Sequence, residues 1–247
     1  MGGWRGYLDA LLDVIFPPLC HVCRCHIPDP DSLHICPSCL AGMPAIAHPL
    51  CTVCGEPFAG RGGDHPCGAC LSRFPGFDMA RAAMPYEGSA RDLIHSFKYR
   101  HKSHLKHALS QMMARRLAGE FLPGAPDIVV AVPLHPRRLR QRGFNQSMLL
   151  ADGVSRAWGV PLERRALCRI RWTEPQADLT AEERHANVRG AFDCRLPDRV
   201  AGRRVLLVDD VLTTGSTVDE CARVLKGYGA RAVLVAAAAR ALSGRSP

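Results

Sequence analysis

Eight cysteines, arranged as two copies of one spacing, constrain the fold of the first 70 residues more than any other feature of this 247-residue chain. In each copy, two Cys-x2-Cys pairs are separated by twelve residues, and every cysteine of the second copy lies 31 positions after its counterpart. The first copy uses Cys20, Cys23, Cys36 and Cys39, and the second uses Cys51, Cys54, Cys67 and Cys70. Four matches at one offset indicate a tandem repeat.

Paired Cys-x2-Cys turns are typical of tetrahedral zinc sites, because each turn brings two thiolates to one ion and a second turn completes four sulfur ligands. The intervening loops are rich in proline and glycine, so bound metal would supply the folding energy that a small core cannot. Disulfides would need an oxidising compartment, and redox chemistry would use a single Cys-x2-Cys pair. We therefore predict two structural zinc sites, favour sequential pairing within each copy, and expect the off-pattern thiol of Cys25 to be no ligand.

The charge of the chain changes where the cysteine repeat ends. Residues 1–75 carry 4 Lys and Arg against 6 Asp and Glu, whereas residues 76–247 carry 28 against 17. We expect two domains with this boundary, and we expect an anionic partner or substrate to meet the basic second domain. Each four-cysteine zinc site adds about −2 to the acidic first domain, which favours a scaffold or protein-contact role for it.

The chain contains no run of 18 apolar residues, so we expect no membrane insertion. The apolar stretch at residues 4–16 includes Asp9 and Asp13, which a signal peptide would not carry. Its apolar positions have helical spacing and predict an amphipathic helix that packs on the protein itself, with membrane docking as the alternative. These features favour a soluble, cytoplasmic protein.

After residue 77 the sequence alternates between apolar strand patterns and helical patterns. We predict strands at 81–86, 127–132, 204–208 and 231–236, and helices at 90–98, 103–119, 146–158 and 217–228. Strands separated by helices of this length predict an α/β fold, with a mostly parallel sheet flanked by helices on both faces.

The most specific segment, at residues 205–217, reads Val-Leu-Leu-Val-Asp-Asp-Val-Leu-Thr-Thr-Gly-Ser-Thr. A buried strand leads to Asp209 and Asp210, and the small residues 213–217 then open a helix. Backbone N–H groups and hydroxyls at a helix N-terminus favour a phosphate, and Gly215 would let the backbone approach it closely. The two carboxylates fit ribose hydroxyls or hydrated Mg²⁺. The alternative is a strand-end turn that is merely capped by Asp and Thr.

This segment resembles the phosphoribosyl pyrophosphate (PRPP) motif of type I phosphoribosyltransferases, and the whole chain resembles the ComF/GntX family. Further matches are Phe-Pro-Pro at 16–18, Ile-His-Ser-Phe-Lys-Tyr at 94–99, Val-Pro-Leu-His-Pro at 132–136 and Arg-Gly-Phe-Asn-Gln at 142–146. The sequence departs from the family at His101-Lys102, where a glycine is common. The resemblance implies a type I phosphoribosyltransferase-like domain preceded by a small double zinc ribbon.

The resemblance also implies site residues. PRPP-binding would fall to Asp209, Asp210, Val211, Thr213, Thr214, Gly215, Ser216 and Thr217, with the two aspartates catalytic and Mg²⁺ bound with PRPP. The pyrophosphate loop would be Leu134, His135, Pro136 and Arg137. Residues 169–189 resemble the flexible loop that closes over PRPP, with a plain surface excursion as the alternative.

Three functions follow from the resemblance and the charge. The first is a phosphoribosyltransferase-like protein with an unnamed acceptor, and the second is a competence adaptor that binds single-stranded DNA without transferase activity. A DNA-uptake helicase is the partner that the family implies, and a purely structural adaptor is the third reading. Phe97 and Tyr99 could stack on bases, and the expected DNA or phosphate contacts are Lys98, Arg100, Lys102, Arg138, Arg140 and Arg142.

Overall fold

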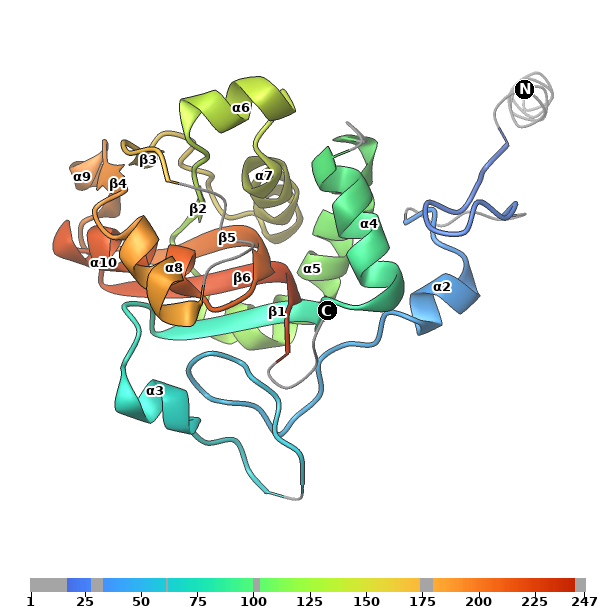
Figure 1. The fold of residues 1–247 in the computed structure, drawn as a ribbon, viewed down its shortest axis with the longest axis horizontal. Helices are drawn as coiled ribbons and strands as arrows, with labels where there is room; N and C mark the ends of the chain where they lie inside the picture. Colours follow the sequence, from blue (N-terminus) through green and yellow to red (C-terminus); the bar gives the residue numbers. More distant parts are fainter. Residues whose placement is uncertain (1–16, 28–32, 61, 100–102, 174–179, 243–247) are drawn as a thin grey trace.

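Four parallel strands form a twisted sheet at the centre of the molecule (Figure 1), in the order β1-β6-β5-β2. Their bounds are β1 Met79–Pro85, β2 Ile128–Ala131, β5 Arg204–Leu212 and β6 Ala232–Arg240. Because all four strands run in the same direction, their carboxyl ends meet at one edge of the sheet. The predicted α/β fold with a mostly parallel sheet is confirmed.

This computed structural model describes residues 17–27, 33–60, 62–99, 103–173 and 180–242. The helix predicted at residues 4–16 lies outside the described residues, as do Arg100 and Lys102. Among the residues that the structure describes, no helix is both long enough and apolar enough to cross a membrane.

Helices cover both faces of the sheet and enclose two apolar cores. One face packs against α4 (Gly88–Tyr99), α5 (Lys106–Phe121) and α7 (Gln146–Trp158). The other face packs against α10 (Ser216–Gly227) and the antiparallel pair β3 (Leu167–Arg169) and β4 (Phe192–Cys194). The remaining short helices are η1 Ser103–Leu105, η2 Leu122–Gly124, α6 Pro136–Arg142, α8 Ala181–Val188 and α9 Pro197–Val200.

Strand β5 shows why the chain folds into these layers. Leu206 and Val208 face the first core, whereas Val205 and Leu207 face the second, and all four are fully buried. A strand that is apolar on both sides needs cover on both sides, which the helices supply.

The structure corrects several predicted boundaries. Strand β5 does not end at Val208 but continues to Leu212, because it stays paired with β6 as far as Arg240, beyond the end of β2. Asp209 and Asp210 therefore lie within the strand. The segment 169–189, predicted as a loop, contains helix α8, although residues 174–179 lie outside the described part.

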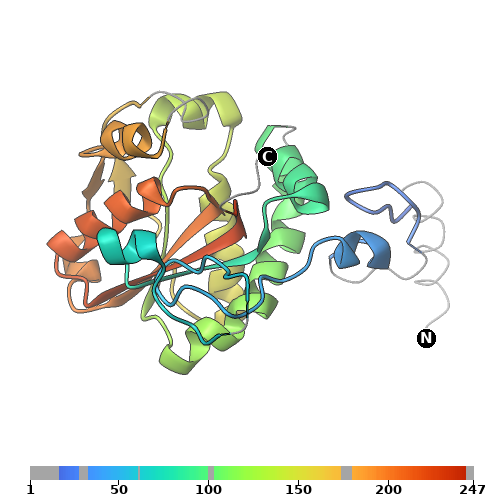
Figure 2. The same ribbon diagram turned by 60° about the horizontal axis from the view of Figure 1, so that its bottom comes forward.

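The two cysteine modules lie next to different parts of the sheet domain (Figures 1 and 2). The first ends in helix α2 (Pro37–Ala41) and lies beyond α4, at one end of the molecule. The second ends in helix α3 (Gly68–Ser72) and runs along β1, where the Ala80 N–H donates to the Val53 carbonyl oxygen at 2.7 Å. The repeat in sequence is thus also a repeat of local structure.

Candidate functional site

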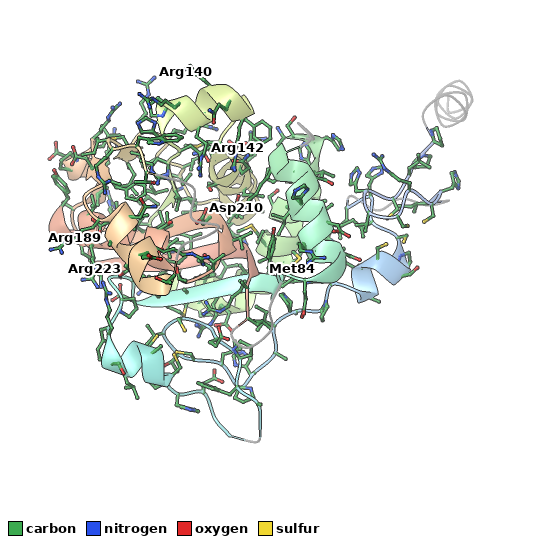
Figure 3. The ribbon with its side chains drawn as sticks, in the orientation of Figure 1. Met84, Arg140, Arg142, Arg189, Asp210 and Arg223 are labelled. Carbon is green, nitrogen blue, oxygen red and sulfur yellow. The ribbon has the colours of Figure 1, made fainter. Side chains whose placement is uncertain are left out.

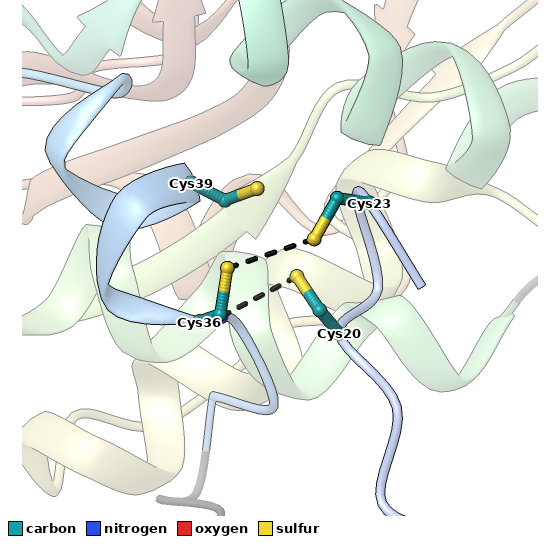
Figure 4. A group of neighbouring side chains, drawn as sticks. All are labelled: Cys20, Cys23, Cys36 and Cys39. Carbon is teal, nitrogen blue, oxygen red and sulfur yellow. Dashed lines mark hydrogen bonds between the residues drawn. The ribbon is translucent and has the colours of Figure 1, made fainter. Parts of the chain in front are cut away.

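Each cysteine module gathers four sulfur atoms that all lie within 4.8 Å of one another. Figure 4 shows the first group, in which the Cys36 N–H donates to the Cys20 sulfur at 3.3 Å. The matching bond in the second group joins the Cys67 N–H to the Cys51 sulfur at 3.2 Å. Such bonds stabilise thiolates, and four thiolates in a cluster fit a tetrahedral zinc ion. The sequential pairing of the cysteines is confirmed.

The second sulfur group is tied to the end of the sheet by Arg240, the last residue of β6. Its Nε donates to the Glu56 carboxylate at 2.7 Å and its Nη1 to the Cys54 carbonyl oxygen at 2.8 Å. Nη2 lies 3.7 Å from the Cys54 sulfur. A guanidinium next to a thiolate cluster offsets part of its negative charge. The charge of the second sulfur group is therefore partly balanced by a residue of the sheet domain.

A pocket of about 380 Å³ opens at the carboxyl ends of the strands. It holds two carboxylates, Asp209 and Asp210, and five cations: Lys98, Arg138, Arg142, Arg169 and Arg184. Figure 3 shows Arg142 and Asp210 in this region and Arg140 on the outward side of α6. The excess of cations makes the pocket suited to a ligand with several negative charges.

Asp209 is held at the floor of this pocket by two hydrogen bonds. The Ser147 hydroxyl and the Asp210 N–H both donate to its Oδ1, each at 2.9 Å. Burial, with a smaller contribution from the neighbouring Asp210 carboxylate, raises the pKa of Asp209 to about 7, although its hydrogen bonds and Lys98 act in the opposite direction. A carboxylate that is costly to ionise gains most from a cation that arrives with a ligand.

Asp210 forms an ion pair with Lys98 of helix α4, with 2.9 Å between Oδ1 and Nζ. Burial alone would lower the pKa of Lys98, but attraction to Asp210 raises it above its ordinary value, so the lysine stays charged. Lys98 thus lies inside the pocket rather than on an open surface. Phe97 is fully buried in the first core, so the prediction that it stacks on DNA bases is wrong.

The loop after β5, which the sequence predicts to bind a phosphate, leads into helix α10. Gly215, with φ of +77°, is the N-cap of α10, a conformation that favours glycine. The Thr214 hydroxyl donates to the Ser216 hydroxyl oxygen at 3.1 Å. Val211, Thr213 and Thr217 line the 380 Å³ pocket. The predicted segment therefore does border this cavity, although Thr214 and Gly215 face another one.

That second pocket, of about 470 Å³, lies on the other side of the same loop. Thr213, Thr214 and Gly215 line it together with three cysteines of the second module, Cys54, Cys67 and Cys70. The phosphate loop therefore lies between the cationic pocket and the second sulfur group.

The predicted pyrophosphate segment only partly enters the pocket. Leu134 lines it, whereas the half-buried His135 caps helix α6 by accepting the Arg137 N–H at 3.2 Å, and Pro136 is the first residue of that helix. Arg138 and Arg142 of α6 line the pocket, and Arg140 does not. The guanidinium carbons of Arg137 and Arg138 lie 5.9 and 5.6 Å from the centre of the Trp172 ring.

The polar residues of the pocket that were not assigned from the sequence include Arg169, Arg184 and Gln146. Arg169 stacks on the Phe192 ring at 5.2 Å, and its buried Nε has no hydrogen-bond partner in the part of the chain that the structure describes. Burial, and then repulsion from Arg138, lowers the pKa of Arg169. Arg169 and Arg184 lie in the stretch predicted as a flexible loop, which gave no reason to place either side chain here.

Gln146 is the most deeply buried of these three, with 1% of its surface exposed. Its Oε1 accepts from Arg142 Nη1 at 3.3 Å, but its Nε2 has no partner among the described residues. A buried donor without an acceptor is costly, so a ligand oxygen at this point would satisfy it. Gln146 is the last residue of the Arg-Gly-Phe-Asn-Gln segment that matches the family, but the sequence alone did not indicate what this residue does.

Comparison with known protein families matches both parts of the chain. Residues 11–71 match the double zinc ribbon domain, and residues 145–247 match the phosphoribosyl transferase domain. The likeness to solved structures is weaker. The glutamine PRPP amidotransferase of B. subtilis, solved with ADP and GMP, is 24% identical with a TM-score of 0.38, over 56% of this chain and 26% of that one.

Two curated relatives are similar in sequence. DNA utilization protein YhgH of Escherichia coli (strain K12) is 44% identical over 149 residues, which are 58% of this chain and 63% of that protein. Competence protein F of Haemophilus influenzae is 32% identical over 153 residues, or 60% of this chain and 67% of that protein. The match thus spans less than two thirds of YhgH.

Proposed function

The chain belongs to the ComF family, in which a double zinc ribbon accompanies a phosphoribosyltransferase domain, and from this premise we propose that it binds PRPP with Mg²⁺ in the 380 Å³ pocket. The observation that carries the proposal is the gathering of five cations around two carboxylates next to a phosphate loop. PRPP carries about five negative charges, and arginine forks suit its phosphates.

The order of groups around the pocket supports one orientation of the ligand. The 5-phosphate meets the loop at Thr213 and Thr217, at the N-terminus of α10. The ribose hydroxyls lie at Asp209 and Asp210, and the pyrophosphate meets the arginines, near the Gln146 Nε2 that has no acceptor among the described residues.

The two aspartates fit a magnesium ion that arrives with the pyrophosphate, because hard carboxylate oxygens are the protein ligands that Mg²⁺ prefers. The raised pKa of Asp209 is consistent with a carboxylate that lacks a full counter-charge until the ligand binds. When bound, Mg²⁺ would neutralise part of the pyrophosphate charge.

Transfer of the pentosyl group would need little covalent chemistry from the protein. As the bond between C1 and pyrophosphate lengthens, Arg138, Arg142 and Arg169 stabilise the negative charge that develops on the leaving group. The ionised Asp209 and Asp210 stabilise the positive charge that develops on the ribose ring. The acceptor is a nucleophile that attacks C1, and the pocket fixes the geometry of that attack.

A second function, binding of single-stranded DNA, is favoured by the basic charge of residues 76–247 and by the names of the relatives, which refer to competence and DNA utilization. It is compatible with PRPP binding. Arg137 and Arg140 of α6, which are exposed and do not line the pocket, are the described arginines best placed for phosphates of a strand. A DNA-uptake helicase remains the proposed protein partner.

Two arginines of one helix offer a matched test of the PRPP proposal. Arg142→Leu removes a cation that lines the pocket, and Arg140→Leu removes one that does not. Calorimetric titration of the zinc-loaded chain with PRPP and Mg²⁺ should show affinity about tenfold or more weaker for Arg142→Leu and nearly unchanged for Arg140→Leu. Equal losses of affinity in the two variants would mean that PRPP binds outside this pocket. No binding of PRPP by the unaltered chain would contradict the proposal.

A further inference from the structure

The two cysteine modules can be compared residue by residue, because the 31-residue offset holds for the backbone as well as the cysteines. The Cys20 N–H donates to the Cys25 carbonyl oxygen at 2.8 Å, and the Cys51 N–H donates to the Glu56 carbonyl oxygen at the same distance. Bridges between Leu19 and His26 and between Leu50 and Pro57 repeat the pattern. The backbone at matching positions therefore has the same placement relative to the sulfur group in both modules.

The modules differ in chemistry at one position beside the metal site. In the second module it is Glu56, whose carboxylate accepts from Arg240 of the sheet. In the first module it is Cys25, whose sulfur lies 3.3 Å from that of Cys23. The first site thus has a fifth thiol beside its group of four sulfurs, whereas the second has four thiols and a glutamate whose carboxylate pairs with a guanidinium.

A zinc ion takes four of these sulfurs, so one thiol of the first site is left uncoordinated. Exposure shows which thiols a small oxidant reaches first. Cys23 and Cys25 are both exposed, whereas Cys20 and Cys36 are buried and Cys39 is half-buried. In the second site, every ligand is buried or half-buried. The spare thiol therefore lies beside the most accessible ligand of the two sites.

We propose that Cys25 is a thiol-oxidation site: a hydroperoxide joins Cys25 to Cys23 in a disulfide, and the first zinc ion is released while the second is retained. The inference rests on the sulfur geometry and does not depend on the binding of PRPP. It assigns Cys25, which the zinc pattern leaves without a role, a function of its own.

The chemistry balances with hydrogen peroxide as the oxidant. The Cys25 sulfur attacks one peroxide oxygen, which gives a sulfenic acid and one water. The Cys23 sulfur then attacks the Cys25 sulfur and displaces its hydroxyl group, which leaves as a second water. The two thiols lose two electrons and two protons, and one peroxide becomes two waters. Zinc dissociates because the Cys23 thiolate has been consumed, and a thiol reductant with added zinc reverses the change.

The test uses the full-length, zinc-loaded chain treated with a small excess of hydrogen peroxide. Zinc release is followed with a chromogenic chelator, and the disulfide is located by peptide mapping. The unaltered chain should release one of its two zinc ions and form a Cys23–Cys25 disulfide. Cys25→Ser should release that zinc about tenfold more slowly, whereas Cys168→Ser, which removes a half-buried thiol far from both sites in sequence, should behave like the unaltered chain.

Several outcomes would overturn the proposal. They are release of zinc from Cys25→Ser at the original rate, equal loss of both ions, or a mapped disulfide that excludes Cys25. Zinc release without any disulfide would mean that Cys25 acts only as an exchange ligand, which also counts against it. Because peptide mapping of the unaltered chain needs no variant, the proposal stays testable even if Cys25→Ser folds poorly.

Discussion

The first cysteine module packs against the helices of the sheet domain, whereas the second is hydrogen-bonded to its strands. Ile27, Leu33 and Met43 of the first module belong to the apolar core that α4 and α5 cover, and the His21 ring lies 5.1 Å from that of His104. The second module instead receives bonds from β1, through the Ala80 N–H, and from β6, through Arg240.

This difference shows how a duplicated metal module can take on two roles. The second copy borders the pocket behind the phosphate loop, so its position affects the loop that we propose for PRPP. The first copy carries an exposed fifth thiol, Cys25. We therefore expect the second copy to hold the loop of the proposed PRPP site in place. We expect the first copy to be the one whose thiols are oxidised.

Removal of each metal site in turn should give the largest contrast. Cys54→Ser with Cys67→Ser should lower the free energy of unfolding of the sheet domain by about 3–5 kcal/mol, because the module that braces β1 and β6 loses its metal. Cys23→Ser with Cys36→Ser should release one zinc and lower this free energy less, because the first module packs on helices α4 and α5 rather than on the strands. Denaturant unfolding and zinc analysis check both variants, and equal destabilisation would contradict the difference in attachment.

Two matched turn positions give a smaller contrast. Gly55 has φ of +73°, and a Cβ there would lie 2.5 Å from the Ala80 carbonyl oxygen, so Gly55→Ala should cost about 3 kcal/mol. The equivalent residue of the first module, Arg24, also has positive φ, at 65°. Arg24→Gly should relieve this conformation and stabilise the chain by about 0.5–1 kcal/mol. Thermal unfolding measures both, and a stable Gly55→Ala protein would show that the second module is loosely attached.

The effect of pH should separate the pocket from both modules. Zinc sites weaken as pH falls, because protons compete for the thiolates. Asp209 acts in the opposite sense: its pKa of about 7 in the folded chain exceeds its ordinary value of 3.8, so the stability it contributes is lost as pH rises towards 7. Between pH 5 and pH 8 the unaltered chain should therefore lose about 2–3 kcal/mol relative to Asp209→Asn. A constant difference across this range would mean that Asp209 ionises normally.

Local patterns predicted much of this molecule. The repeat spacing favoured the sequential grouping of the cysteines that the structure has, and helix α7 has the predicted bounds, with Asn145 as its N-cap. Helix α8 was missed although its capping box was legible: the Thr180 hydroxyl accepts from the Glu183 N–H, and the Glu183 carboxylate accepts from the Thr180 N–H. The segment is polar and lacks a clear apolar helical pattern, so it was predicted as a loop.

Other features depend on contacts between distant parts of the chain, which local patterns do not contain. Strands β3 and β4 have three residues each and exist because they pair across more than twenty positions. The extension of β5 to Leu212 depends on β6. Lys98 reaches the pocket only because α4 lies over the end of the sheet, which brings it to Asp210.

The most direct measurement of the central claim is calorimetric titration with PRPP and Mg²⁺ of three zinc-loaded proteins: the unaltered chain, Cys23→Ser with Cys36→Ser, and Arg240→Ala. The account predicts that the first-module variant binds PRPP as the unaltered chain does. It predicts that Arg240→Ala, which cuts the link between the second sulfur group and the sheet, binds several times more weakly. Loss of binding in the first-module variant, together with normal binding by Arg240→Ala, would contradict it.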